Sequence, residues 1–147
     1  NKLLNKYFIN RYFMPNIQLK LTDHLKKFAN TSIDISDGLL ADLDKMINSQ
    51  KLSYKIDLIN IPISNNLKKI LDFKRLSKIN CISKGDDYQV LFTASKGKRE
   101  IIKKISSNFG IKVTKIGIIQ SINKKSSIVD QKNIKIRVKN KGYFHQF

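Results

Sequence analysis

The apolar residues of this chain change their spacing several times, and each change predicts a different kind of element. Some recur every three or four positions, as on one face of a helix, and others alternate with polar residues, as along a half-buried strand. Helical spacing predicts helices within 3–12, 17–28, 38–48, 64–71 and 96–108. Alternation or short apolar runs predict strands at 32–35, 52–59, 88–93, 112–119, 126–129 and 134–138.

Residues typical of helix ends refine these boundaries. Pro15 is expected to end the first helix, and Thr22, Ser64 and Ser95 are candidate N-caps, Thr22 for a helix over 23–29. Gly110 is well placed to close the last helix. The final two strands flank residues 130–133 and predict a hairpin. Helices and strands alternate without strict regularity, so we expect a single α/β (α+β) domain with a mixed β-sheet covered by helices.

One stretch, residues 34–43, combines a strand end, a tight turn and a helix start. Asp34 and Asp37 flank Ser36, and Gly38 marks the turn. Unpaired N–H groups at a helix start favour anions, and aspartate oxygens suit Mg²⁺, so a polyphosphate site is one interpretation. The other is that Ser36 or Asp37 simply caps the helix. The local pattern leaves both interpretations open.

Composition narrows the class of protein. The chain has 147 residues, 41% of them hydrophobic, which is enough for one domain with a core. No apolar run is long enough to span a membrane, and residues 1–14 lack the features of a signal peptide. The first residue is Asn1, so we expect a processed chain or a piece of a longer one, and favour a piece. The single Cys81 cannot form an internal disulfide, which favours a cytoplasmic location and a structural role for this thiol.

The formal net charge of +18 raises the possibility of nucleic-acid binding. However, lysines are spread along the whole chain, and no stretch interleaves them with aromatic residues as a stacking surface requires. A non-catalytic basic nucleic-acid-binding module is therefore kept only as an alternative. The acids are scarcer and more clustered, at Asp34, Asp37, Asp42 and Asp44 and at Asp86 and Asp87. We expect Asp42 and Asp44 to lie on the solvated surface of a helix.

Four separated motifs resemble one family. Residues 32–43 are similar to the aspartate motif that opens the second half of thiamine-monophosphate kinases, which belong to the aminoimidazole-ribonucleotide-synthetase-like superfamily. Residues 85–93 resemble that family's Gly-Gly-Asp/Glu-Asp-Tyr-Glu-Leu-Leu-Phe-Thr motif. Gly142-Tyr143, with His145 nearby, resembles its C-terminal ending, and Arg11-Tyr12-x-x-Pro15 resembles a segment before the domain. The order agrees along nearly all of the chain.

The resemblance implies an activity and a set of site residues. The family phosphorylates thiamine monophosphate with ATP, giving thiamine diphosphate and ADP, and requires Mg²⁺. Asp34 and Asp37 would bind Mg²⁺, Ser36 would contact ATP, Asp86 would bind the substrate, and Tyr143 would lie against it. An aromatic face and a carboxylate suit the thiazolium cation of thiamine. No catalytic residue is assigned, because phosphoryl transfer depends mainly on positioning and charge neutralisation.

The match to the family is incomplete in two ways. Lys84 replaces a glycine, Gln89 replaces a glutamate, and the ending has one extra residue between His145 and the last Phe. We expect His145 to be structural. The resemblance also covers only the C-terminal half of the family. It therefore implies an N-terminal domain of the same protein as a partner, a homodimer when intact, and little or no kinase activity for this chain alone. A superfamily enzyme acting on another phosphate acceptor is the remaining alternative.

Overall fold

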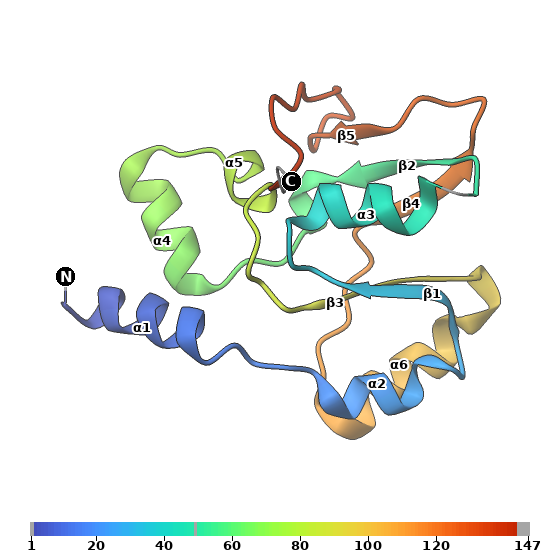
Figure 1. Ribbon diagram of the computed structural model, residues 1–147, viewed down its shortest axis with the longest axis horizontal. Helices are drawn as coiled ribbons and strands as arrows, with labels where there is room; N and C mark the ends of the chain where they lie inside the picture. Colours follow the sequence, from blue (N-terminus) through green and yellow to red (C-terminus); the bar gives the residue numbers. More distant parts are fainter. Residues whose placement is uncertain (1, 49, 144–147) are drawn as a thin grey trace, which may run out of the picture.

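The computed structural model describes residues 2–48 and 50–143 and has helices packed around short strands (Figure 1). The helices are α1 (Lys2–Phe13), α2 (Leu19–Leu25), α3 (Leu39–Asn48), α4 (Asn65–Lys74), α5 (Ile79–Ile82) and α6 (Arg99–Phe109), with short 3₁₀ turns η1 (Leu58–Asn60) and η2 (Lys96–Lys98). The strands are β1 (Ala29–Asp34), β2 (Leu52–Asp57), β3 (Val90–Ala94), β4 (Gly117–Ser121) and β5 (Ser127–Val129).

The named strands form two sheets. Strands β1 and β3 make an antiparallel pair, and the other sheet has the order β4-β2-β5. Strand β2 runs antiparallel to β4 and parallel to β5, so this second sheet is mixed. The predicted α/β class with a mixed sheet is confirmed, although the strands are divided between two sheets.

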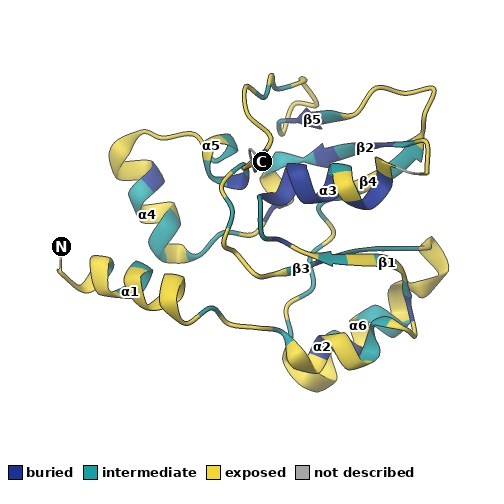
Figure 2. Ribbon diagram, in the orientation of Figure 1, coloured by how far each residue is buried: buried dark blue, intermediate teal, exposed yellow. Residues whose placement is uncertain are grey.

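The protein has two apolar cores, and the two-stranded sheet contributes side chains to both. Helix α3 packs beside β1 and β2, so it contacts both sheets, and it is the most buried helix in Figure 2. Its side chains Leu40 and Leu43 are 0% and 2% exposed, and removing such residues from water stabilises the fold by about 1.5–3 kcal/mol each. The second core is built around Leu21 of α2, Phe28 and Ile105 of α6. The phenyl rings of Phe28 and Phe92 lie 5.1 Å apart and join the turn between α2 and β1 to β3.

Several predicted boundaries are confirmed. The side chain of Ser64 accepts a hydrogen bond from the amide of Leu67 at 3.1 Å, as expected of an N-cap. Gly110 ends α6 in the left-handed conformation, with φ of 62°. Helix α3 follows the predicted range within one residue.

Other boundaries were wrong for identifiable reasons. Thr22 lies inside α2, where its hydroxyl donates to the carbonyl of Leu19 at 2.7 Å instead of capping a later helix. The predicted strand at 88–93 begins only at Val90, because Tyr88 has φ of 50°. The strand predicted at 112–119 lies at 117–121 instead. Residues 134–138 form no named strand, although Lys135 makes an isolated bridge with Val129 that retains the hairpin geometry.

Helix α1 contributes no buried side chain to either core. Its predicted apolar stripe is partly exposed, with Leu3 at 81% and Tyr12 at 63%. None of the helices in the described part of the chain combines the length and the apolar character needed to cross a bilayer.

Candidate functional site

Three segments that are far apart in the sequence meet at the turn before α3. The carbonyl oxygen of Ser36 accepts a hydrogen bond from the amide of Asp86 at 2.9 Å. The next carbonyl, that of Asp37, accepts one from the amide of Tyr143 at 2.8 Å. Asp86, expected to bind the substrate, is therefore bonded to Ser36, the expected ATP contact. Tyr143, also expected to contact the substrate, is bonded to Asp37, the second expected Mg²⁺ ligand.

The pairing of β1 with β3 places Asp34 beside this turn. Asp34 is the last residue of β1 and pairs with Val90. The ladder then continues through Ile35, whose amide donates to the carbonyl of Gln89 and whose carbonyl accepts from the amide of Tyr88, each at 2.9 Å. All five site residues predicted from the sequence are thus carried by segments that meet here.

Two glycines permit this close approach. A Cβ atom on Gly85 would overlap the carbonyl oxygen of Ser36, and one on Gly142 would lie 2.6 Å from the carbonyl oxygen of Asp37. Side chains at these positions would push the three segments apart. The glycines in the two motifs therefore have a direct packing role at the site.

The segment that carries Asp86 has a constrained backbone. Asp86 and Tyr88 have φ of 64° and 50°, a conformation uncommon outside glycine. The Tyr88 hydroxyl lies 3.3 Å from Oδ1 of Asp86 and donates a hydrogen bond to it. The charge of Asp86 is the main cause that raises the pKa of Tyr88, followed by loss of hydration.

Asp42 is wholly buried, which corrects the expectation that it would lie on a solvated helix surface. Its Oδ2 accepts hydrogen bonds from the amides of Ser36, Asp37 and Gly38 at 2.9, 2.9 and 3.1 Å. These amides were expected to be available to an anion, but the chain's own carboxylate occupies them. Neither interpretation of this stretch had named Asp42 as the residue that organises the turn.

Lys45 neutralises this carboxylate and links it to the expected metal site. Its Nζ donates to Oδ1 of Asp42 at 2.9 Å and also forms an ion pair with Oδ2 of Asp37. The hydrogen bond to Asp37, followed by that to Asp42, raises the pKa of Lys45, so the ammonium stays charged. The side chain of Asp37 is 14% exposed, which places this pair at the edge of the protein.

The adjacent acids Asp86 and Asp87 keep a negative potential at the site. Within the residues that the structure describes, neither of them has an ion-pair partner. Asp87 is exposed as a residue, but neighbouring atoms remove part of the hydration of its carboxyl. This loss of hydration, and then the charge of Asp86, raises the pKa of Asp87. The arrangement attracts a cation.

The side chains present suit Mg²⁺, provided that other oxygens complete its shell. Across residues 2–48 and 50–143, no three metal-ligating side chains form a group able to hold an ion by themselves. Mg²⁺ commonly uses one or two carboxylates together with waters and substrate phosphates. The carboxylates of Asp34 and Asp37 match that partial donor set in chemistry.

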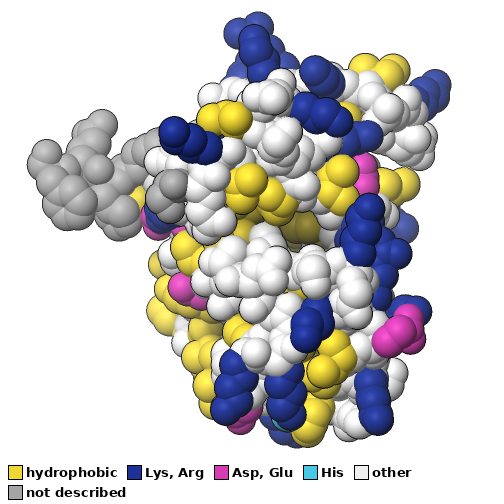
Figure 3. All heavy atoms as spheres, turned by 90° about the vertical axis from the view of Figure 1, so that its right-hand side faces the viewer, with side chains coloured by type: hydrophobic (Ala, Val, Ile, Leu, Met, Phe, Trp, Pro, Cys, Tyr) yellow, Lys and Arg dark blue, Asp and Glu magenta, His cyan; other side chains and the backbone are white. Residues whose placement is uncertain are grey.

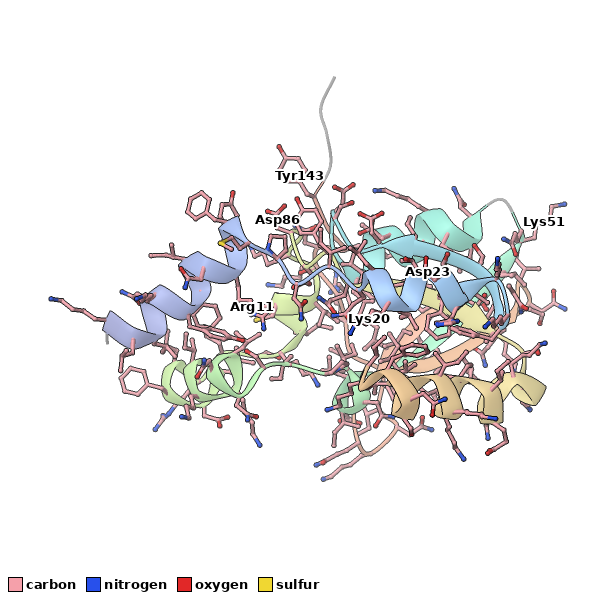
Figure 4. All side chains as sticks on the ribbon, turned by 90° about the horizontal axis from the view of Figure 1, so that it is seen from below. Arg11, Lys20, Asp23, Lys51, Asp86 and Tyr143 are labelled. Carbon is pink, nitrogen blue, oxygen red and sulfur yellow. The ribbon has the colours of Figure 1, made fainter. Side chains whose placement is uncertain are left out.

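An ion pair anchors the segment that carries Tyr143. The Nζ atom of Lys141 lies 2.7 Å from Oδ2 of Asp44, and the carbonyl of Lys141 accepts the amide of Ala41 at 3.1 Å. Asp44, expected on the solvated surface of a helix, is 37% exposed and is paired with Lys141. Figure 4 shows Asp86 and Tyr143 on the same side of the molecule. Tyr143 is an exposed residue, with 64% of its surface accessible.

The remaining predicted residues are less informative. Burial, and then the charge of Asp87, raises the pKa of the Cys81 thiol, which disfavours the nucleophilic thiolate. The Gln89 side chain donates to the carbonyl of Asp87 at 3.3 Å, so it supports its own loop. Lys84 is exposed, and His145 lies outside the described residues. Figure 3 shows lysine and arginine side chains spread over the face in view and not gathered in one place.

Comparison with known proteins identifies relatives. No family model matches the chain. The thiamine-monophosphate kinase of Buchnera aphidicola subsp. Acyrthosiphon pisum is 35% identical over 146 residues, which cover 99% of this chain and 44% of that protein. The chain is homologous to part of the thiamine-monophosphate kinases. It spans less than half the length of the relatives it matches.

Solved thiamine-monophosphate kinases have the same fold over this region. The enzyme from Stenotrophomonas maltophilia K279a is 27% identical, with a TM-score of 0.72, and the match covers 83% of this chain and 37% of that one. A structure described as AaThiL complexed with AMPPCP and TMP is 26% identical, with a TM-score of 0.72, covering 96% of this chain and 42% of that one. That kinase therefore binds an ATP analogue and TMP.

The sequence pattern did not indicate the roles of two residues at this turn, Asp42 and Lys45. A carboxylate in the first turn of a helix with a lysine three positions later is usually an exposed pair. The available signal was the position of Asp42 one turn after three consecutive loop amides, where a carboxylate can reach back to them.

Proposed function

We propose that this chain supplies part of the site at which ATP phosphorylates thiamine monophosphate, giving thiamine diphosphate and ADP. The observation that carries the proposal is the pair of neighbouring carbonyls, those of Ser36 and Asp37, which hold the amides of Asp86 and Tyr143. One short turn thereby connects the expected metal and nucleotide residues to the expected substrate residues. Homology to the thiamine-monophosphate kinases supports this assignment over other phosphate acceptors.

In this proposal the carboxylates of Asp34 and Asp37 hold Mg²⁺, and Ser36 contacts ATP. Bound Mg²⁺ would neutralise charge on the phosphate oxygens and fix their orientation. Because Asp42 already satisfies the amides of residues 36–38, these amides do not bind phosphate. The phosphates are therefore held by cations and side chains.

Asp86 and Tyr143 bind the thiamine end of the substrate. The negative potential of Asp86 and Asp87 favours a thiazolium cation, and the Tyr143 ring offers an aromatic face. The acceptor of the phosphoryl group is itself a phosphate, so the reaction does not require a strong general base.

The rest of the site belongs to a further part of the protein. The Buchnera relative is more than twice as long as the region it shares with this chain. We propose that the partner is an N-terminal domain of the same protein, that the intact enzyme is a cytoplasmic homodimer, and that this chain alone has little kinase activity. ATP turnover with thiamine monophosphate and Mg²⁺ tests the last point, and a rate near that of an intact enzyme would refute it.

Binding of thiamine monophosphate to this chain tests the substrate assignment. Isothermal titration should detect binding that Asp86→Asn weakens about three- to tenfold, because the carboxylate charge is lost. Asparagine tolerates the left-handed backbone at this position, so the loop should be retained. Asp72→Asn, an exposed acid on α4, is the matched control. Stronger binding of another phosphate acceptor, or salt-dependent DNA binding without a response to Mg²⁺, would favour the alternatives.

A further inference from the structure

Lys45 places a cation directly beside a proposed metal ligand. Its ammonium pairs with Oδ2 of Asp37, and the proposed function assigns this same carboxylate to Mg²⁺. An ammonium and a divalent cation repel each other, and they seek the same oxygen atoms. Binding of either cation to Asp37 therefore weakens binding of the other.

The position of Lys45 is built into the fold. Its second contact is Oδ1 of the wholly buried Asp42, at 2.9 Å, while Oδ2 of Asp42 holds the three loop amides. The lysine is thus attached to the carboxylate that shapes the turn. Its side chain is nevertheless 51% exposed, so the ammonium has room to move away from Asp37 while it keeps Asp42.

We propose that Lys45 is a resident counter-cation of Asp37 that a divalent cation must displace. In the metal-free protein it neutralises Asp37 and holds its carboxylate in place; when the divalent cation binds, it keeps Asp42 and releases Asp37. Lys45 therefore lowers the affinity for the divalent cation. This inference rests on the proposed function, because it requires Asp37 to be a metal ligand.

The test measures Mn²⁺ binding directly, by isothermal titration and by loss of the free Mn²⁺ magnetic-resonance signal. Mn²⁺ shares the preference of Mg²⁺ for carboxylate oxygens and is observable without catalysis. Lys45→Met should bind Mn²⁺ about three- to tenfold more tightly than the unaltered chain, since one nearby positive charge is removed from a partly hydrated site. Lys45→Gln, which can still donate to Asp42, should give the same direction if Lys45→Met folds poorly.

The chain offers a matched control. Lys103 on α6 pairs with Glu100 at 2.9 Å and with the same three-residue spacing as Lys45 and Asp42. Lys103→Met changes the net charge equally but removes one member of an exposed pair on another helix, so it should leave Mn²⁺ affinity unchanged. A similar increase in both variants would show a general charge effect and overturn the proposal.

The outcomes separate this inference from the proposed function. If Asp37→Asn abolishes Mn²⁺ binding while Lys45→Met leaves it unchanged or weakens it, the metal site stands and the displacement proposal is overturned. If no variant binds Mn²⁺, or Asp37→Asn has no effect, the assignment of Asp37 as a ligand fails and both fall. Tighter binding by Lys45→Met and Lys45→Gln, lost when Asp37→Asn is added, supports the proposal.

Discussion

The amide of Tyr143 donates a hydrogen bond to the carbonyl of Asp37 at 2.8 Å. This bond joins the last described residue of the chain to the turn that precedes α3. The backbone, and not a flexible side chain, therefore fixes the position of Tyr143, the expected aromatic contact to the substrate, relative to Asp37, an expected metal ligand. Changes that disturb this bond should affect substrate binding even when they touch neither side chain.

Gly142→Ala should weaken thiamine monophosphate binding at least several-fold. The new Cβ would lie 2.6 Å from the carbonyl oxygen of Asp37, so the segment carrying Tyr143 must move. We expect a loss of about 1–3 kcal/mol in the free energy of unfolding, measured by urea titration. Gly97→Ala is the control, because nothing lies within 4 Å of its added methyl group. Equal behaviour of the two variants would show that the close approach is unimportant.

Asp42→Asn should destabilise the protein by about 2–4 kcal/mol. The change removes a buried charge that accepts three amide hydrogen bonds and pairs with Lys45. Urea unfolding followed by circular dichroism measures the effect. Asp72→Asn, at an exposed site on α4, should change stability by less than about 0.5 kcal/mol. A small effect at Asp42 would mean that the loop amides find other partners easily.

The pair of Asp44 and Lys141 should act on substrate binding more than on stability. Both side chains are partly exposed, at 37% for Asp44 and 49% for Lys141, so a double-mutant cycle with Asp44→Asn and Lys141→Met should give a coupling of only about 0.2–1 kcal/mol. Either change should nevertheless weaken thiamine monophosphate binding, because Lys141 precedes the Gly142–Tyr143 segment. The pair Glu100–Lys103, which is more exposed, supplies the control cycle. Unchanged binding in both single variants would exclude an anchoring role.

Asp87→Asn should stabilise the protein near neutral pH. The folded state raises the pKa of Asp87 above its ordinary value of 3.8, so the ionised carboxyl is less favourable in the folded than in the unfolded chain. This penalty is absent below the unfolded pKa and develops as pH rises through the folded pKa. We expect Tm to rise by about 1–3 °C at pH 7 and to be unchanged in acid below the ordinary pKa.

The control for this titration is Asp23→Asn, an exposed acid on α2. It changes the net charge equally at an exposed position on a helix. A gain in Tm at Asp87 that persists in acid, or one that Asp23→Asn reproduces, would contradict the role assigned to the pKa shift.

The sequence predicted elements whose apolar residues recur at regular spacing. It did not predict features that depend on which distant segments of the chain come together. Helix α3 was predicted within one residue because its apolar spacing directly reflects the face that packs on the sheet. The division of the strands into two sheets could not be read locally, because it depends on which strands meet. Tyr88 is an example. Alternating apolar and polar residues predicted that it begins a strand, but it is left-handed and its amide donates to the carbonyl of Ile35.

The same distinction applies to the site. Asp34, Asp37, Ser36, Asp86 and Tyr143 were selected by motif resemblance, and the structure brings their segments together. Asp42 was misassigned, because a buried acid and a surface acid look alike in a helical pattern and the three amides that bind Asp42 belong to a loop. Lys45 was missed because its contact with Asp37 depends on how the turn folds back over α3.

In many phosphate-binding proteins, backbone amides at the start of a helix bind the ligand. Here the amides of residues 36–38 donate to the carboxylate of Asp42 instead. Because these amides already have an acceptor, an oxyanion such as sulfate should not bind at this turn. Sulfate should therefore neither raise Tm through this turn nor compete there with nucleotide. If the proposed function holds, selectivity for the nucleotide depends on the cation bound to its phosphates, and this turn would bind a metal–phosphate complex but not a free anion.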